Sequence, residues 1–384
     1  MAAIALSART IPIDFPGRHV LRLTRNPDLP HYEKSHSAFL ASEEIPPKSS
    51  LDGFPFVLTS DRSFPSAIPI PSKLGYLTEG DIIRLVPSQG EWRVLYRKDS
   101  RHNVLFITEK CNSRCVMCSQ PPRDIDDGYL IEEILQAIPL MATKTSQLCI
   151  TGGEPTLYFS GLLQIIRSVK ERLPKTSLHM LSNGRLFSHM EYARAITSLD
   201  HPDFVIGIPL YSDQPSRHDY VVQSKGAFDE TILGLLNLAR YGQRMEIRFV
   251  IHRETLPCMV ATAKFIARNL PFASHVALMG LEPTGFARTN LEALWVDPWD
   301  YQQELEEAVT ILRQAQLRVS VYNHQLCILP QSVWPVAVQS ISDWKNVYLE
   351  CCNLCSLKNR CSGFFSSNDR AHSLHISPIV SEIA

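Results

Sequence analysis

The stretch NVLFITEKCNSRCVMC, residues 103–118, joins an apolar segment of strand length to a loop with three cysteines. These are Cys111, Cys115 and Cys118, in the spacing C-x3-C-x2-C, and the next cysteine is Cys149. A structural zinc site normally uses four ligands. An iron–sulfur cubane with three protein ligands leaves one iron open to another molecule. We therefore interpret the loop as an iron–sulfur site, with a zinc site completed by a distant ligand and a redox disulfide as alternatives.

From residue 103 onwards, segments of strand length alternate with segments of helical periodicity. In YLIEEILQAI, residues 129–138, the apolar side chains fall on one helical face. The sixth strand is followed by the helical segment at residues 299–316. Alternation of this kind predicts a parallel sheet with right-handed crossovers. Six units fit an open doubly wound sheet, but we favour an α/β fold with a partial (β/α)6 TIM-like barrel. The six expected strands lie at residues 103–108, 147–151, 177–182, 204–211, 245–252 and 275–281.

Two further regions flank this barrel. Residues 1–100 contain eleven of the 26 prolines and three segments that alternate like strands. These segments are FPFVLTS, GDIIRLV and EWRVLYR. An edge strand at EWRVLYR could dock a peptide by β-augmentation, but we favour the alternative that this region covers the barrel or contacts a partner protein. We expect a small β-rich module over residues 1–100, the barrel over 101–317, and a C-terminal cysteine-rich auxiliary-cluster segment over 318–384.

Composition excludes several classes of function. A net charge of -1 over 384 residues gives no reason to expect nucleic acid as a bulk electrostatic partner. We find no apolar run near the ~18 residues of a membrane helix and no export signal at the start of the chain. Seven of the ten cysteines fall in two clusters, which favours metal binding in a reducing cytoplasm over disulfides. We therefore expect a cytoplasmic protein with no membrane partner.

The unusual loop motifs follow the expected strands, where parallel α/β folds place their chemistry. The cysteine loop follows the first strand. TGGEPT (151–156), SNG (182–184), YSD (211–213) and GLEPTG (280–285) follow later ones. Because these strand ends share one rim, the motifs are expected to lie close together.

CNSRCVMC followed by TGGEPT resembles the radical S-adenosylmethionine (SAM) superfamily over residues 103–285. The resemblance implies that Cys111, Cys115 and Cys118 hold a [4Fe-4S] cluster whose open iron binds SAM. One electron, from an external donor, then splits SAM to a 5′-deoxyadenosyl radical that abstracts a substrate hydrogen. The family usually has an aromatic residue where this chain has Met117, which keeps a large apolar side chain.

The resemblance also implies SAM contacts at the strand ends. Gly152 and Gly153 lack Cβ atoms, so the backbone could approach a ligand closely. Glu154 could accept a hydrogen bond from the SAM amine or hold the loop. Ser182 and Asn183 lie where the family places a polar residue near the SAM ribose or carboxylate, and an ordinary Asn-Gly turn is the alternative.

Five further residues have a structural interpretation, and all of them except Cys149 have a functional one as well. Arg248 could reach the SAM carboxylate or pair with an acid inside the barrel. His218 and Asp219 resemble a motif of peptide-modifying members, or they cap a surface helix. Cys258 is expected to be structural, although a thiol near the barrel rim could donate a hydrogen atom. Cys149 is expected to be a buried, apolar-like residue.

A second cysteine set lies near the end of the chain. Cys352, Cys355 and Cys361 are spaced C-x2-C-x5-C, and Cys327 lies upstream after the expected strand RVSVY. Four thiolates make a closed site. The pattern resembles the shortened auxiliary-cluster domain of radical SAM peptide maturases, which implies a second [4Fe-4S] cluster, while zinc is the alternative. Cys351 could replace Cys352 as a ligand.

The details CVMCSQPP, YNHQLC and SDWKN followed by CCNLC resemble the C-type maturase of His-Xaa-Ser peptide systems. This resemblance implies a precursor peptide with His-Xaa-Ser repeats and a second radical SAM maturase as partners. The alternatives are a radical SAM enzyme that acts on a small molecule or an RNA base, and a non-catalytic metal-bound scaffold for a partner.

Overall fold

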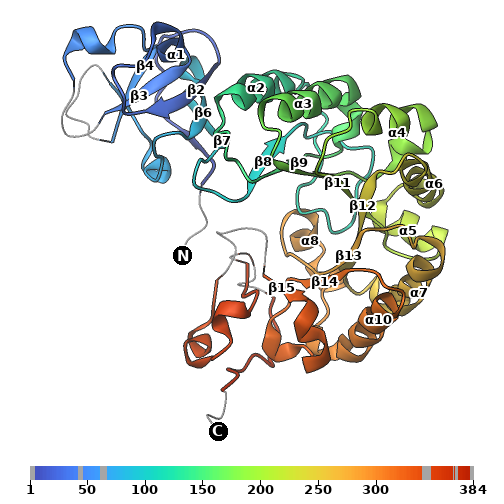
Figure 1. The fold of residues 1–384 in the computed structure, drawn as a ribbon. Helices are drawn as coiled ribbons and strands as arrows, with labels where there is room; N and C mark the ends of the chain where they lie inside the picture. The colour runs from blue at the N-terminus through green and yellow to red at the C-terminus, as the bar shows by residue number, and fades with distance from the viewer. Residues whose placement is uncertain are drawn as a thin grey trace.

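The computed structural model describes residues 5–41, 46–60, 67–339, 347–365, 367 and 371–380. The stretch SDWKN (342–346) lies outside these residues. Figure 1 shows a small sheet near the N-terminus and a larger curved sheet with helices along its outer side.

The larger sheet is parallel throughout and follows chain order from β8 to β15. All six expected strands are present, so the partial barrel is confirmed. The sheet also continues past them, because the strand expected at RVSVY pairs with the sixth strand and a two-residue strand follows. The strands are β8 (Asn103–Phe106), β9 (Gln147–Thr151), β10 (Ser177–Leu181), β11 (Phe204–Pro209), β12 (Arg244–Ile251), β13 (His275–Gly280), β14 (Val319–Tyr322) and β15 (Ala337–Val338).

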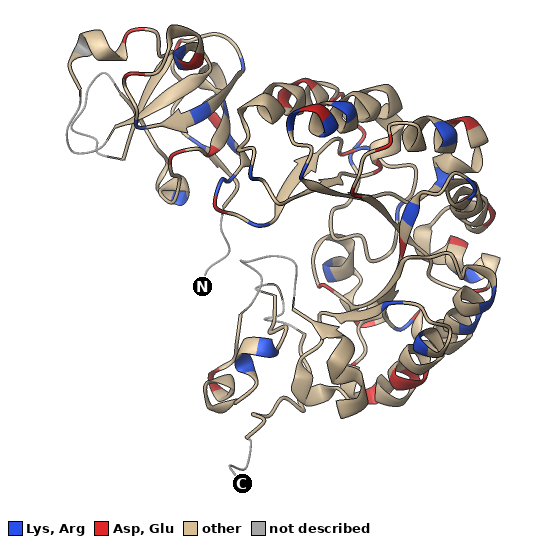
Figure 2. Cartoon of the chain, viewed as in Figure 1, with Lys and Arg blue, Asp and Glu red and all other residues tan. Residues whose placement is uncertain are grey.

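Long helices follow the strands and cover the convex side of this sheet (Figure 1). On β12, Met245, Ile247 and Phe249 belong to the core shared with these helices. Because side chains alternate along a strand, Glu246 and Arg248 point to the concave side. Lys and Arg, as well as Asp and Glu, are distributed along the outer helices (Figure 2). These helices are α2 (Tyr129–Ala137), α3 (Phe159–Arg172), α4 (Met190–Thr197), α6 (Ala227–Arg240), α7 (Met259–Asn269) and α10 (Gln302–Gln314).

Three short helices lie in loops at the strand ends and were not expected from the sequence. They are α5 (Pro215–Val222), α8 (Gly285–Thr289) and α9 (Leu291–Leu294). Elements this short show too few turns for helical periodicity to be detected. None of the helices in the described residues is long and apolar enough to cross a membrane.

The N-terminal region forms the expected β-rich module, a seven-stranded sheet in the order β1-β7-β6-β2-β3-β4-β5. β7 covers the first six residues of EWRVLYR and pairs with β6 on one side and β1 on the other. The expectation of an edge strand there is therefore wrong. The covering strand has only three residues and no apolar alternation, which is why the sequence did not indicate it. The elements are β1 (Ser7–Arg9), β2 (His19–Thr24), α1 (His31–Ser35), β3 (Ser37–Ala41), β4 (Phe56–Thr59), β5 (Ile68–Pro69), β6 (Ile82–Val86) and β7 (Glu91–Tyr96).

The small sheet packs against α2 of the barrel. Tyr96 at the end of β7 is buried in the barrel core, and its hydroxyl lies 2.8 Å from Thr145 Oγ1. The Arg18 guanidinium lies 3.7 Å from the centre of the Tyr129 ring and 3.3 Å from Glu133. This mixed apolar and charged contact fixes the first strand of the barrel, β8, next to the module.

Candidate active site

The three cysteines of the loop after β8 come together at the carboxyl end of the barrel sheet. Cys111, Cys115 and Cys118 are each partly exposed. Burial, together with the neighbouring Cys118 and Cys111, raises the pKa of the Cys115 thiol to about 12. Thiols in such a loop become thiolates when a metal centre supplies positive charge. The three thiols thus lie close enough to interact electrostatically, as the ligands of one cluster would.

The carbonyl end of α5 holds this loop in place. The backbone N–H of Arg114 donates to Val222 O at 3.1 Å, and that of Val116 donates to Val221 O at 2.9 Å. Met117 is buried among apolar side chains of the same helix and its surroundings. The large apolar residue at this position therefore anchors the loop, and the unexpected helix α5 is part of the site.

Gly285, the last residue of GLEPTG, and the residues after it support the same loop. The backbone N–H of Phe286 donates to Cys118 O at 2.8 Å, and Asn290 Nδ2 donates to Val116 O at 2.8 Å. A Cβ atom on Gly285 would lie 2.4 Å from Cys118 O. The glycine thus permits α8 to approach the backbone of the cysteine loop.

The two glycines of TGGEPT face protein backbone. Gly153 N donates to Thr108 O at 2.7 Å, and Glu154 N donates to Lys110 O at 2.7 Å. A Cβ atom would lie 2.5 Å from Thr108 O at Gly152 and 2.1 Å from Lys110 O at Gly153. The sequence predicts close approach to a ligand here. In the structure the approaching group is the segment that leads into the cysteine loop.

Glu154 is buried and accepts four hydrogen bonds. Its Oε1 accepts from Thr156 N at 3.0 Å, Thr156 Oγ1 at 2.7 Å and Ser182 Oγ at 2.8 Å. Its Oε2 accepts from Asn183 N at 2.6 Å. Burial raises the pKa of this carboxyl, and the hydrogen bonds act in the opposite direction. Two roles were expected for Glu154. The structure shows the second, in which its carboxylate holds the TGGEPT and SNG loops together.

The SNG loop after β10 contacts the cysteine loop directly. Asn183 Nδ2 donates to Asn112 Oδ1 at 2.6 Å. Arg185 donates to Asn112 O at 2.6 Å and to Ser113 Oγ at 3.1 Å, and it pairs with Glu230 at 2.5 Å. Sequence reasoning missed Arg185, although a basic residue directly after a strand-end turn was a signal for it. The expected residues Ser182 and Asn183 therefore act here as supports of the loop.

Arg248 lies inside the barrel and is paired with an acid. Its Nη1 donates to Glu246 Oε1 at 2.5 Å, and its Nη2 lies 3.1 Å from Met279 Sδ. A Cβ atom on Gly207 would lie 3.1 Å from Arg248 Cδ, so the glycine makes room for the guanidinium. Of the two interpretations of Arg248, the ion pair within the barrel is the one observed.

Glu246 is the centre of a polar cluster inside the barrel. It lies 2.6 Å from His275 Nδ1 and 3.7 Å from His179 Nε2, and His275 Nε2 lies 2.9 Å from Ser320 Oγ. Burial alone would raise the pKa of Glu246. The hydrogen bond from His275 and the charge of Arg248 outweigh burial and lower it to about 2.

This pKa predicts a pH-dependent contribution of Glu246 to stability. A carboxyl whose folded pKa is lowered stabilises the fold above its unfolded pKa and loses that contribution as the pH falls through the folded pKa. Glu246→Gln is expected to lower the free energy of unfolding by about 2 kcal/mol near pH 7, and the difference should shrink between about pH 5 and pH 2. Urea unfolding across this pH range measures it, with exposed Glu171→Gln as the control. A difference that does not change with pH would contradict the prediction.

His218 and Asp219 have structural partners. His218 Nδ1 accepts from Tyr211 N at 3.2 Å, and burial lowers its pKa to about 4. Asp219 accepts from Gly226 N at 2.5 Å and from Phe228 N at 2.9 Å, where α6 begins. These contacts fit the helix-capping interpretation.

The remaining two single cysteines also fit structural roles. Cys258 is buried and its Sγ lies 3.1 Å from Thr255 O. Cys149 lies on β9, where burial raises the pKa of its thiol to about 11.

The four cysteines of the second set line one pocket in the C-terminal segment. They are joined there by apolar side chains, among them Leu326, Phe364 and Ile379. The structure therefore gathers residues that are up to 34 positions apart in the chain (361 − 327). Cys352 lines the pocket, which favours it over its neighbour Cys351. The four are Cys327, Cys352, Cys355 and Cys361.

Within the described ranges, no three His, Cys, Asp or Glu side chains converge closely enough to hold a single metal ion. Structural zinc requires such convergence on one point. The thiolates of a cubane each bind a different iron and lie farther apart.

Comparison with known proteins agrees with this site. Residues 105–266 match the model of the Radical SAM superfamily. This span includes the cysteine loop, TGGEPT and SNG. Residues 105–266 therefore form a radical SAM domain.

Two curated proteins share parts of the sequence. The chain is 26% identical over 165 residues to the Fe-coproporphyrin III synthase of Methanosarcina barkeri, which covers 42% of this chain and 40% of that protein. It is 32% identical over 101 residues to a UPF0026 protein of Helicobacter pylori, which covers 24% of this chain and 32% of that protein. The chain thus spans well under half the length of these relatives.

Solved structures with some likeness include Streptococcus suis SuiB bound to S-adenosylmethionine, with a TM-score of 0.46 and 15% identity over 59% of this chain and 51% of that one. Methylornithine synthase (PylB) has a TM-score of 0.44 and 13% identity over 58% of this chain and 64% of that one.

Proposed function

We propose that this protein is a radical SAM enzyme that modifies a ribosomally made peptide, with a His-Xaa-Ser repeat precursor as the substrate. The observation that carries the proposal is the cysteine loop of a radical SAM domain, fixed at the carboxyl end of the barrel. Cys111, Cys115 and Cys118 would hold a [4Fe-4S] cluster with SAM at its open iron. When bound and reduced by an external donor, the cluster supplies the electron that splits SAM into methionine and the hydrogen-abstracting 5′-deoxyadenosyl radical.

The chain's own residues position this chemistry. The backbone carbonyls of Val221 and Val222 and the backbone N–H of Phe286 hold the cysteine loop from two sides. Glu154 links the TGGEPT and SNG loops, and Arg185 links SNG to the cysteine loop. A rigid rim of this kind keeps a reactive centre in one geometry.

The peptide substrate is supported by the resemblance to the C-type maturases and by the open form of the barrel sheet, whose terminal strands are β8 and β15. A polymer segment can enter an open barrel from the side. We propose the division into a module (1–100), a radical SAM core (101–317) and an auxiliary segment (318–384). β14 and β15 of the last region pair with the barrel sheet, so core and auxiliary segment share that sheet.

The test of the activity is anaerobic incubation of reduced protein with SAM and detection of 5′-deoxyadenosine. Co-expression with the precursor peptide and the second maturase, followed by mass analysis of the peptide, tests the substrate. A mass change in the peptide supports the proposal. SAM cleavage triggered by a small molecule or by RNA, and not by the peptide, would favour the alternative enzymes. No SAM cleavage under any condition would favour the scaffold.

The pocket in the C-terminal segment leads to a second proposal, an auxiliary [4Fe-4S] cluster. Cys355→Ser is expected to lower the iron content by about one cubane, roughly four irons, while SAM cleavage continues without coupling to the peptide. The reason is that SAM would bind the other cluster. Cys351→Ser is the matched control and should retain the iron. Stoichiometric zinc in anaerobically prepared protein would contradict the auxiliary cluster.

A further inference from the structure

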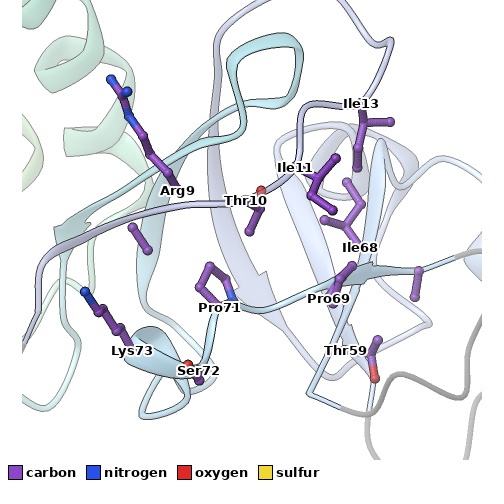
Figure 3. Close-up of a pocket in the computed structure, with 12 residues that line it drawn as sticks. Arg9, Thr10, Ile11, Ile13, Thr59, Ile68, Pro69, Pro71, Ser72 and Lys73 are labelled. Carbon is purple, nitrogen blue, oxygen red and sulfur yellow. The ribbon is translucent and has the colours of Figure 1, made fainter.

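A cavity and a buried side chain lie outside the function proposed above. The cavity, of about 710 Å³, lies in the N-terminal module between the residues that follow β1 and those around β5 (Figure 3). Arg9, which lines it, is ion-paired with Glu91 at 2.9 Å, and nothing in the structure shows what covers the cavity. The side chain is that of Tyr211, in the strand-end motif YSD (211–213). Of the two, Tyr211 has surroundings that identify a ligand.

Tyr211 points to the concave side of the barrel sheet, where Arg248 also lies. Leu210 N donates to Arg248 O at 3.0 Å, so the chain beyond β11 still runs alongside β12. Leu210 belongs to the core that the sheet shares with the outer helices. Because side chains alternate along an extended strand, the next residue, Tyr211, points the opposite way. Its side chain therefore faces the interior of the barrel.

The ring of Tyr211 is held next to the cysteine loop. It belongs to the apolar cluster that contains Met117, and Cys115 packs against the same cluster. The ring also stacks on His218, with the ring centres 5.8 Å apart and the planes at 27°. In the backbone, Tyr211 N donates to His218 Nδ1 at 3.2 Å, and Tyr211 O accepts from Cys258 Sγ at 3.4 Å. Backbone and ring are therefore both fixed in position.

The hydroxyl of Tyr211 has no hydrogen-bond partner among the residues that the structure describes, although Tyr211 is only 8% exposed. By contrast, the hydroxyl of buried Tyr301 lies 2.8 Å from His324 Nε2. A buried tyrosine hydroxyl normally has such a partner, and one without it indicates an ion or ligand at that place. A phenol keeps its proton near neutral pH. The Tyr211 hydroxyl is therefore a donor that faces an acceptor from outside the chain.

The surroundings of this hydroxyl favour the cluster as its acceptor. Burial raises the pKa of Tyr211 well above its usual value, and the sulfurs of Cys115 and Cys118 raise it as well, while Arg248 lowers it. The phenol oxygen thus lies within electrostatic range of two of the three ligand sulfurs. The sulfur atoms of an iron–sulfur cluster accept hydrogen bonds, and these bonds help to set its reduction potential.

We propose that the Tyr211 hydroxyl donates a hydrogen bond to a sulfur of the [4Fe-4S] cluster, on the side of Cys115 and Cys118, and makes the cluster easier to reduce. The cluster gains one negative charge when it accepts an electron, and a donor that faces its sulfur stabilises that charge. The proton stays on the phenol oxygen, so no atom is transferred. The cluster itself rests on the proposed function, whereas the position of Tyr211 does not.

The test is the midpoint potential of the loop cluster in Tyr211→Phe, which removes the hydroxyl and keeps the ring. Full-length protein is titrated anaerobically and the reduced cubane is followed by electron paramagnetic resonance. The signal that the variant without the three loop cysteines lacks identifies the loop cluster. At the wild-type midpoint potential, the ratio of reduced to oxidised cluster should fall roughly tenfold, which is about 59 mV for a one-electron couple. Tyr220→Phe is the matched control, because Tyr220 on α5 is 53% exposed, and it should keep the wild-type potential.

Iron content and stability in urea should match wild type in Tyr211→Phe, because the hydroxyl has no protein partner to lose. Loss of iron from the loop in this variant would make the hydroxyl structural and overturn the inference. Equal midpoint potentials in a protein that cleaves SAM would overturn it too and leave the proposed function standing. Weaker binding of SAM with an unchanged potential would assign the hydroxyl to SAM instead. A lower potential in Tyr211→Phe, when the wild type never cleaves SAM, would keep the role of Tyr211 and reject the proposed function.

Discussion

Replacing Cys111, Cys115 and Cys118 together with alanine is expected to abolish formation of 5′-deoxyadenosine and to remove one cubane's iron. The three residues are the only thiols in the loop that follows β8. Side chains that carry no lone pair for iron cannot replace thiolate ligands. The loss of 5′-deoxyadenosine formation should therefore be complete rather than partial.

Two measurements check this result, namely iron per protein after anaerobic purification and 5′-deoxyadenosine by mass spectrometry. Cys149→Ala is the matched control, because Cys149 lies on β9 and outside the loop, and it should keep both signals. The auxiliary cluster should remain in the triple variant, so the iron content should fall by about half. Continued formation of 5′-deoxyadenosine would show that the catalytic assignment is wrong.

Among substitutions that add one methyl group to the site, Gly153→Ala is expected to cause the largest loss of stability. The new Cβ would lie 2.1 Å from Lys110 O, 2.5 Å from Lys110 C and 3.0 Å from Glu109 O. All three are backbone atoms, so no side chain can move aside to make room. The segment that leads into the cysteine loop must shift, and it would lose the hydrogen bond from Gly153 N to Thr108 O at 2.7 Å.

We expect this variant to lower the free energy of unfolding by about 3 kcal/mol and to reduce the iron bound to the loop. Gly128→Ala is the control, since its Cβ would come no closer than 3.6 Å to the Tyr158 ring. It should change stability by less than about 0.5 kcal/mol. Urea unfolding of metal-free protein separates the effect on the fold from the effect on the cluster. Equal stability of the two variants would contradict the role assigned to Gly153.

The sequence by itself determined the barrel and predicted where in it the site lies. The six strands could be predicted because buried parallel strands and amphipathic helices leave patterns that depend only on neighbouring residues. The spacing of Cys111, Cys115 and Cys118 indicated a cluster because three ligands within one loop need no tertiary information. The motifs after the strands were expected to gather for the same reason, since parallel strands carry their carboxyl ends to one edge.

Only the tertiary structure decided what the residues around the site do. Glu154 and Arg248 each had two interpretations. The observed partners decided between the two, namely Asn183 N for Glu154 and Glu246 Oε1 for Arg248. β1 covers the edge of β7 although 86 positions in the sequence separate Ser7 from its ladder partner Arg93. Contacts of this kind depend on how distant segments pack, and a short strand or a short helix such as α5 leaves no periodic pattern from which they could be predicted.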